Sequence, residues 1–316
     1  MDEIRLAGMI LAGLELAPAD PSDMTALLLS APDRNVLFRS DEDRKPGLSD
    51  EEAATPLARY LAEHIDHARV EHWTKIVDRG VGEGRYSLIP VTDPAYPARL
   101  RQAWDAPPLL FCSVAVSASV SQDASSRPNL GEALSTRPSL AIVGSRETSR
   151  QVSSATESIA SELAAAGVAI VSGLAEGVDT AAHRGALDAY GYTVAVMGTG
   201  IERVYPQSNQ SLAAAIERGG ALVSQFPPSA PPTRTSFLLR NHVIAGMSDA
   251  SLVMDGAERS GSRYEVERAI KYGRLVLAWA PSLGHRRWIK ELVDTGSVHF
   301  VETVAHIREH LARSAS

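Results

Sequence analysis

Cysteine is almost absent from this sequence of 316 residues, which contains only Cys112. A single cysteine allows neither an intramolecular disulfide nor a cysteine-based metal cluster, which fits a reducing cytoplasm. Because Cys112 follows an apolar run at 109–111, it is more typical of a buried core residue than of a nucleophile. We expect the protein to need no metal and no cofactor.

Long apolar runs are also missing. No stretch approaches the run of about 18 apolar residues that spans a bilayer. Charged residues interrupt the apolar segment at 1–16, where a signal peptide needs a basic start and an unbroken apolar core. These absences argue against a membrane protein and predict a cytoplasmic location.

The sequence has no excess of basic residues. Asp and Glu number 38 against 31 Lys and Arg, which gives a formal net charge of −7. This balance argues against a protein that coats nucleic acid through its overall charge. Any grip on phosphate groups must therefore come from a local arrangement of side chains.

The length of the chain allows two or three folded units. Residues 1–80 carry apolar residues at helical spacing and predict a small helical domain with a polar loop at 30–50. Prolines make 81–138 an extended connector, which from residue 117 has the composition of a flexible linker. Residues 282–316 predict a helical extension that contains one short extended piece.

The segment 139–281 has a different pattern, in which short apolar runs alternate with helical segments. The runs are rich in Val and Ile, as buried parallel strands are. They lie at 140–143, 168–171, 193–197, 221–223, 251–254 and 275–278. The alternation predicts an α/β fold, a Rossmann-like doubly wound parallel sheet with right-handed crossovers.

In such a sheet, ligands bind beyond the carboxyl ends of the strands. Loops rich in glycine or serine follow four of the predicted strands, at 144–146, 172–177, 198–200 and 260–263. Glycine lets the backbone approach a ligand closely, and arginine supplies a planar donor for phosphate. The loops together predict a phosphate-bearing ligand. The G-x-G-x-x-G fingerprint is missing, which disfavours an NAD-dependent oxidoreductase.

Several residues near these loops have two interpretations. Asp179 and His183 are four apart and share a helical face, where a structural hydrogen bond is favoured over a catalytic acid–base pair. Tyr205 either stacks on a nucleobase or packs in a turn beside the proline that follows it. Phe237 and Arg240 are three apart, so the aromatic ring could hold the arginine in place.

Five motifs occur in the order found in the DprA/Smf DNA-processing family. They are I-V-G-S-R at 142–146, S-G-L-A-x-G-x-D-x-x-A-H at 172–183, Y-P at 205–206, F-x-x-R-N at 237–241 and S-G-S at 260–262. The chain resembles this family strongly over 139–281. The resemblance implies a Rossmann-like fold that binds single-stranded DNA in a basic pocket, forms a homodimer and helps to load the RecA recombinase during natural transformation. It implies no enzymatic activity.

The resemblance also implies which residues bind nucleic acid. Arg146 and Arg240 would be exposed arginines that grip phosphates, and the loop at 172–177 would offer backbone donors. Arg263 follows the S-G-S motif without belonging to it. The full predicted set is Gly144, Ser145, Arg146, Ser172, Gly173, Gly177, Arg240, Asn241, Ser260, Gly261, Ser262 and Arg263.

The chain departs from the family's pattern at two positions near the pocket. Gln225 stands where the family usually has glutamate, and His242 stands where it usually has arginine. Both departures change the charge at the pocket rim.

An enzyme is the main alternative. Nucleotide phosphoribohydrolases share this variant of the Rossmann fold and use a catalytic glutamate in a G-G-x-G-T-x-x-E loop. Glu267 is the candidate acid, but Arg-Tyr replaces the Gly-Thr of that loop. A nucleotide-binding sensor is a third hypothesis. An open groove favours DNA, whereas a closed cavity favours a nucleotide.

Overall fold

The structure is a computed structural model, which describes residues 2–16, 20–30, 56–113, 129–258 and 260–314. The loop predicted at 30–50 lies almost entirely outside these residues, as does the predicted linker up to residue 128. Where the described chain resumes, it forms the buried helix α6 (Leu130–Ser135). The expectation of a flexible linker is therefore wrong for this helix, because Leu130 and Leu134 pack into the core.

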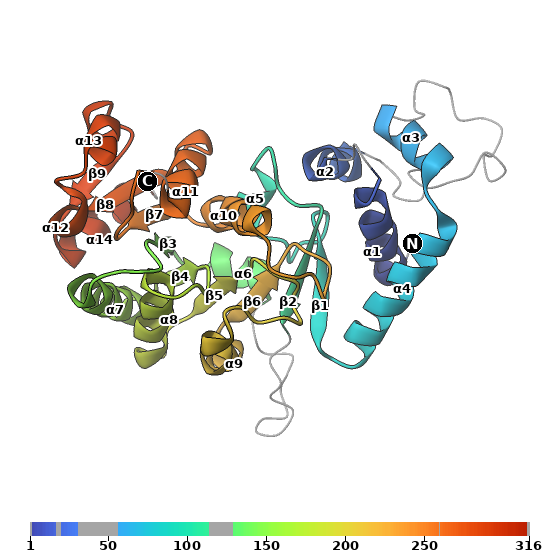
Figure 1. Cartoon of the computed structure of the whole chain (residues 1–316), viewed down its shortest axis with the longest axis horizontal. Coiled ribbons are helices and arrows are strands. Elements are labelled where there is room, and N and C mark those ends of the chain that lie inside the picture. The colour runs from blue at the N-terminus through green and yellow to red at the C-terminus, as the bar shows by residue number, and fades with distance from the viewer. Residues whose placement is uncertain (1, 17–19, 31–55, 114–128, 259, 315–316) are drawn as a thin grey trace.

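In the described residues the strands form one sheet, in the order β1-β2-β6-β5-β4-β3-β7-β8-β9 (Figure 1). The neighbouring strands from β6 to β9 in this order pair in parallel. At the other end, β1 pairs antiparallel with β2, and β2 pairs antiparallel with β6. Their bounds are β1 Tyr86–Pro90, β2 Leu109–Ser113, β3 Ser139–Val143, β4 Ala169–Ser172, β5 Thr193–Val196, β6 Ala221–Ser224, β7 Ala250–Val253, β8 Leu275–Trp279 and β9 His299–Val301. The predicted doubly wound α/β sheet is confirmed.

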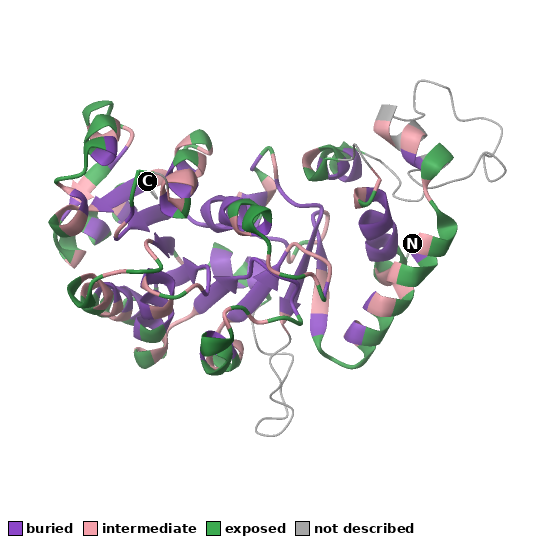
Figure 2. Ribbon diagram, in the orientation of Figure 1, coloured by how far each residue is buried: buried purple, intermediate pink, exposed green. Residues whose placement is uncertain are grey.

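Both faces of the parallel strands β3 to β7 are buried, which explains their largely apolar sequence (Figure 2). In β3, Leu140 and Ile142 join one hydrophobic cluster, whereas Ala141 and Val143 join the other. Successive side chains of a strand point to opposite faces, so each face receives every second residue.

Helices cover the two faces of this sheet. The cluster around Leu140 contains residues of α7 (Arg150–Ala165), α8 (Val178–Asp188) and α14 (Val304–Ser314). The cluster around Ala141 contains residues of α9, α10, α11 and α13. Their bounds are α9 Gln210–Gly219, α10 Arg234–Met247, α11 Gly261–Lys271 and α13 Arg287–Asp294.

The N-terminal helices lie at the opposite end of the molecule from the C-terminal ones (Figure 1). Their bounds are α1 Glu3–Leu14, α2 Pro21–Ser30, α3 Pro56–His64 and α4 His67–Gly82. Leu6 and Ile10 of α1 belong to the same hydrophobic cluster as Phe111 of β2. The Thr25 hydroxyl donates to the Ala106 carbonyl at 2.6 Å. The helices therefore pack on the edge of the sheet, and Met9 and Ala12 of α1 form a small second cluster with Val70 of α4.

The sheet extends beyond 139–281 on both sides. The segment predicted as a connector supplies β1 and β2, with the short helix α5 (Ala98–Arg101) between them. The C-terminal extension supplies α12 (Ala280–Leu283) and β9 in addition to its two longer helices. The domain boundaries themselves stay a prediction. No helix in the described part of the chain is both long and apolar enough to cross a membrane.

The winding direction of the chain reverses next to β3. From β3 the chain winds outward through β4 and β5 to β6, and α10 then carries it back to β7 on the other side of β3. The loops that follow β3 and β7 therefore leave the sheet in different directions. In open α/β sheets this point is where ligands bind.

Candidate functional site

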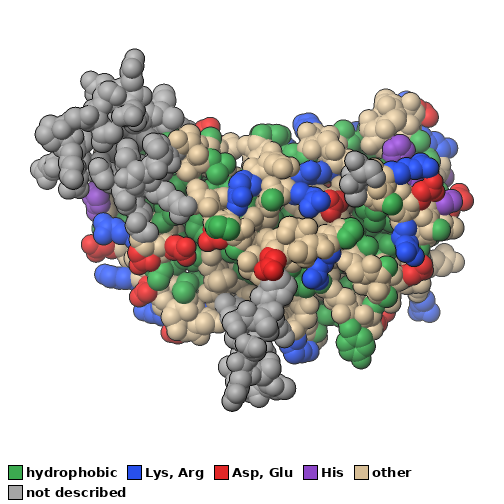
Figure 3. Space-filling view, turned by 180° about the vertical axis from the view of Figure 1, so that it is seen from behind, with side chains coloured by type: hydrophobic (Ala, Val, Ile, Leu, Met, Phe, Trp, Pro, Cys, Tyr) green, Lys and Arg blue, Asp and Glu red, His purple; other side chains and the backbone are tan. Residues whose placement is uncertain are grey.

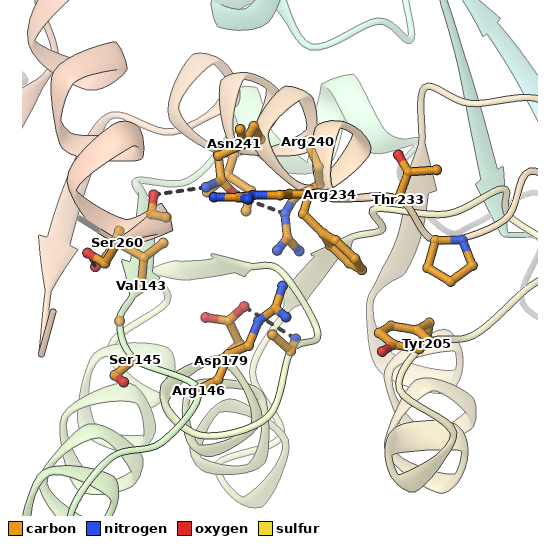
Figure 4. A pocket seen from close by; sticks show the side chains of 18 residues that line it. Val143, Ser145, Arg146, Asp179, Tyr205, Thr233, Arg234, Arg240, Asn241 and Ser260 are labelled. Carbon is orange, nitrogen blue, oxygen red and sulfur yellow. Dashed lines mark hydrogen bonds between the residues drawn. The ribbon is translucent and has the colours of Figure 1, made fainter. Parts of the chain in front are cut away.

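A pocket of about 550 Å³ lies where β3 and β7 end, and we call it the switch-point pocket. Its walls come from the loop after β3, the first turns of α10 and the start of α11 (Figure 4). It is lined by Val143, Gly144, Ser145, Arg146, Ala175, Asp179, Tyr205, Pro232, Thr233, Arg234, Phe237, Leu238, Arg240, Asn241, Ile244, Ser260, Gly261 and Ser262. Of the twelve predicted site residues, eight therefore lie in one pocket.

Arg146 supplies an exposed positive charge in this pocket. Its guanidinium carbon lies 4.8 Å from the centroid of the Phe237 ring. The Phe237 ring in turn lies 5.7 Å from the ring of Tyr205, which is 45% exposed. A cation over an aromatic face is electrostatically favourable, and it holds the guanidinium without consuming its hydrogen-bond donors.

Arg240 is buried at 4% exposure, so the expectation of a second exposed arginine is wrong. Its Nη1 atom donates to the backbone carbonyls of Gly173 and Val196, the latter at 2.8 Å. Burial lowers the pKa of Arg240, and the nearby carboxylate of Asp179 opposes that effect. The side chain ties α10 to the loop after β4 and to the end of β5, and it also lines the pocket.

Asn241 connects α10 with the start of α11. Its Oδ1 atom accepts a hydrogen bond from Arg240 Nε at 3.0 Å, and its Nδ2 atom donates to the Gly261 carbonyl at 3.0 Å. Ser260 caps α11 by accepting a hydrogen bond from the Arg263 backbone N–H at 3.3 Å. The R-N pair of the F-x-x-R-N motif thus positions the N-terminus of α11 at the pocket.

The loop after β4 contributes Ala175 to the lining and shapes the site through its other residues. The Ser172 hydroxyl is fully buried and donates to the Ile142 carbonyl at 2.6 Å. Gly173 leaves room for the Arg240 guanidinium, which a Cβ at this position would meet. Gly177 has a φ of +76° and lies against the carbonyls of Ser145 and Arg146. Its missing Cβ allows the loop that carries Arg146 to approach this closely.

Arg263 lies outside the lining of the pocket. Its Nε atom donates to Glu267 at 3.0 Å, and its guanidinium carbon lies 5.8 Å from the Trp288 ring. Glu267, the candidate catalytic acid, therefore forms an ion pair with Arg263 at the surface.

Asp179 and His183 bind different partners despite sharing a helical face. Asp179 accepts a hydrogen bond from the Ala175 backbone N–H at 3.3 Å, and burial raises its pKa while Arg240 lowers it. His183 is fully buried with Nδ1 2.8 Å from the Thr193 hydroxyl, and burial lowers its pKa to about 3. A hydrogen bond between the two, which the spacing favoured, does not form.

Sequence reasoning missed Thr233 and Arg234, which line the pocket at the start of α10. Thr233 and Ser236 form a reciprocal capping box, which begins the helix and places the exposed Arg234 at the pocket (Figure 4). The T-x-x-S spacing was a visible signal for this helix start.

Sequence reasoning also missed Glu265, which lies in α11 and is completely buried. Its Oε1 atom accepts a hydrogen bond from Ser251 at 2.6 Å, and its Oε2 atom has no hydrogen-bond partner among the described residues. Burial raises its pKa to about 7. Glu265, four residues after Gly261, fits the spacing of a G-T-x-x-E loop better than Glu267 does.

Charge on the visible surface is mixed, with basic and acidic side chains interspersed over the face shown in Figure 3. This fits the net charge of −7. In the pocket, by contrast, three arginines face a single acidic residue, Asp179. The basic character of the site is local.

The comparisons with known proteins agree with the motifs. The model of a family described as DNA recombination-mediator protein A matches residues 130–312. The Smf protein of Escherichia coli is 36% identical over 201 residues, which are 63% of this chain and 50% of that protein. DNA processing protein DprA of Streptococcus pneumoniae is 36% identical over 194 residues, or 61% of this chain and 63% of the relative. The chain thus matches roughly half to two thirds of their length.

Two solved structures are similar to the fold as well as to the sequence. DprA from Streptococcus pneumoniae has a TM-score of 0.71 at 25% identity and covers 98% of both chains. DNA processing protein A from Helicobacter pylori, a single-stranded DNA-binding protein, has a TM-score of 0.60 at 25% identity over 72% of this chain and 96% of that one. Since the family model spans more than half of its residues, this chain belongs to the DNA recombination-mediator protein A family, whose relatives include Smf and DprA.

Proposed function

We propose that this protein binds single-stranded DNA in the switch-point pocket and acts as a recombination mediator. The observation that carries the proposal is the arrangement of Arg146, Phe237 and Tyr205 in one open pocket. Arg146 is exposed and can donate to a phosphate group, and the two rings offer apolar faces beside it. This pairing of cation and aromatic rings suits a ligand with phosphates and flat bases.

The start of α11 adds backbone donors to this site. Ser260, Gly261 and Ser262 line the pocket at the N-terminus of an eleven-residue helix. The first N–H groups of a helix have no partner within it, and the helix dipole favours an anion there. A phosphate between Arg146 and this helix start would receive charge from one side and backbone donors from the other.

Single strands fit this pocket better than duplex DNA does. Tyr205 and Phe237 can stack only on bases that are not already stacked inside a double helix. The Helicobacter pylori relative binds single-stranded DNA, which supports the same ligand here. On the face shown in Figure 3, acidic side chains are interspersed with basic ones, which does not favour a duplex backbone there.

A direct test compares a fluorescent single-stranded oligonucleotide with the same sequence as a duplex, using anisotropy at several salt concentrations. We expect tighter binding of the single strand and affinity that falls as salt rises, with a modest slope because few arginines are available. Equal binding of the duplex, or binding that ignores salt, argues against the proposal.

Family membership supports two finer parts of the proposal. The first is that the protein, which we place in the cytoplasm, forms a homodimer. The second is that it loads a RecA-type recombinase. Light scattering of the purified chain tests the first. The second predicts that the protein speeds assembly of a RecA-type recombinase on DNA already covered by single-strand-binding protein. A monomeric mass, or assembly at an unchanged rate, rejects the corresponding part.

We further propose that the protein is not an enzyme. A phosphoribohydrolase needs an acid that touches the glycosidic bond, but Glu267 is paired with Arg263 at the surface and Glu265 is fully buried. Neither carboxyl group lines the switch-point pocket. Arg146, Tyr205 and Leu238 are exposed in its walls, so the pocket is open and does not enclose a small nucleotide as a sensor would.

A further inference from the structure

A second pocket, of about 520 Å³, lies between the N-terminal helices and α10, and we call it the Trp104 pocket. Its lining is rich in aromatic and apolar side chains. The lining includes Trp104, Phe226, Leu239, Tyr264 and Arg268. Its position next to the switch-point pocket raises the question of what it binds.

Trp104 is 61% exposed, which is unusual for so large an apolar side chain. The guanidinium carbon of Arg268 lies 5.2 Å from the Trp104 ring and 5.1 Å from the Tyr264 ring. Arg268 also donates hydrogen bonds to Asp105 at 3.3 Å and to the Tyr264 hydroxyl at 3.0 Å. An arginine fixed in this way holds Trp104 through one side of its ring and leaves much of its surface in solvent.

Different faces of the same two helices line the two pockets. On α10, Leu238 lines the switch-point pocket and the next residue, Leu239, lines the Trp104 pocket. Both leucines are exposed, at 37% and 40%. On α11, Ser262 lines the first pocket and Tyr264 lines the second. A strand that leaves the switch-point pocket and passes around α10 over these two leucines would enter the Trp104 pocket.

Most carboxylates of the Trp104 pocket are already paired. Asp105 is shared by His242, Arg268 and Tyr272. Glu15, at the far wall, pairs with Arg69 and accepts a hydrogen bond from Trp73 Nε1 at 3.1 Å.

Asp20 is the remaining acid in the lining of the Trp104 pocket. It precedes α2 and accepts hydrogen bonds from the backbone N–H and the hydroxyl of Ser22 in that helix. The pocket thus presents aromatic surface with little free charge, which suits a base more than a phosphate.

We propose that a base of the same DNA strand that occupies the switch-point pocket stacks on Trp104. This inference rests on the proposed function, and it names a second contact point for that ligand. Stacking on an aromatic side chain tolerates any base, because every base has a flat π-face. The Trp104 pocket would lengthen the stretch of DNA held by each protein chain without adding sequence preference.

The test measures anisotropy with a short oligonucleotide of about 4 nucleotides and a long one of about 16, lengths that bracket common single-strand site sizes. In Trp104→Ala we expect roughly tenfold weaker binding of the long oligonucleotide and little change for the short one. Trp104→Phe keeps an aromatic face and should bind the long oligonucleotide nearly as the wild type does. Tyr190→Ala is the matched control, since Tyr190 is an aromatic residue with 99% exposure outside both pockets.

Tryptophan fluorescence gives a second measurement. Trp104 is exposed, whereas the other three tryptophans of the chain are partly or fully buried. The long oligonucleotide should therefore quench the emission of Trp104. Quenching should persist in Tyr190→Ala and largely disappear in Trp104→Phe. Chemical unfolding of each variant shows whether folding is unchanged.

The outcomes separate this inference from the proposed function. If the wild type binds no single-stranded DNA, the proposed function fails first. A second outcome rejects the Trp104 contact alone. In it, the wild type binds single-stranded DNA and Arg146→Ala weakens this binding. Trp104→Ala, however, has wild-type affinity for both oligonucleotides, and the fluorescence quenching persists in Trp104→Phe. Loss of self-association in Trp104→Ala with unchanged DNA binding would also reject it, and would assign the pocket to a second copy of the chain.

Discussion

The absence of a side chain at Gly173 leaves the space that the guanidinium group of Arg240 occupies, and Arg240 donates a hydrogen bond to the Gly173 carbonyl. Both residues belong to motifs that the sequence displays, yet they are 67 positions apart. Their contact joins the loop after β4 to α10. It explains why a glycine and an arginine are needed at the floor of the switch-point pocket.

Removing Arg240 should destabilise the fold. Arg240→Ala leaves the carbonyls of Gly173 and Val196 without this donor and the buried carboxyl of Asp179 without its nearby positive charge. Leaving a buried acceptor without its donor costs about 1–3 kcal/mol. Urea unfolding should show the loss, whereas Arg287→Ala, which removes an arginine with 93% side-chain exposure, should change nothing measurable. An Arg240→Ala protein as stable as the wild type would refute the buried role.

Adding a methyl group at Gly173 should disturb the same contact from the other side. In Gly173→Ala the new Cβ meets the guanidinium of Arg240, which is held by hydrogen bonds and cannot move freely. Overpacking a buried contact costs about 1–3 kcal/mol. Gly82→Ala is the control, because its Cβ meets nothing within 4 Å. Equal unfolding midpoints for the two variants would contradict the close approach of Arg240.

The pKa of Glu265 predicts a pH-dependent effect on stability. Burial raises this pKa from 4.5 to about 7, so the folded protein holds a proton that the unfolded chain releases. The free energy of unfolding contributed by this group therefore falls as the pH rises from about 4.5 to about 7.

Glu265→Gln removes this ionisation while keeping an oxygen that can accept the hydrogen bond from Ser251. Relative to the wild type, the variant should be similar in stability near pH 4.5 and more stable above about pH 7, by at most about 3 kcal/mol. Urea unfolding at both ends of this range measures the difference. If the difference in stability does not vary with pH, burial does not raise the pKa of Glu265 in the folded protein.

The hydrolase alternative makes its own prediction. If Glu267 were a catalytic acid, the protein would release free base from nucleoside monophosphates and Glu267→Gln would stop the release. We expect no release by the wild type and unchanged DNA binding in Glu267→Gln, because the Glu267 side chain pairs with Arg263 outside the pocket. Chromatography of the incubated nucleotide decides between the two. Release that depends on Glu267 would make the protein a nucleotide hydrolase.

The parallel sheet could be predicted because its strands are buried on both faces and so are continuously apolar. The run predicted at 140–143 became β3 with one extra residue. The pairing of β1 and β2 with this sheet could not be predicted, because Phe111 and its partner Ser224 are far apart in the sequence. The helix α6 could not be predicted from local composition either, because its two leucines are surrounded by residues typical of linkers.

The site could be predicted as a set of loops but not as a set of roles. Motifs placed Arg146 and Arg240 in the same pocket correctly. They could not show which arginine is buried, because the burial of Arg240 depends on carbonyls from β5 and the loop after β4. Glu265 was hidden for the same reason, since its partner Ser251 lies on another element. Whether the pocket residues bind DNA stays a prediction.

The central claim is that Arg146 holds a phosphate of single-stranded DNA in the switch-point pocket. Arg146→Ala and the control Arg287→Ala should be compared with the wild type by anisotropy over a range of salt concentrations. We expect Arg146→Ala to bind more weakly, with the slope of log affinity against log salt smaller in magnitude by about 0.7, and to unfold as the wild type does. An affinity and a salt slope equal to those of the wild type and of Arg287→Ala would contradict the claim.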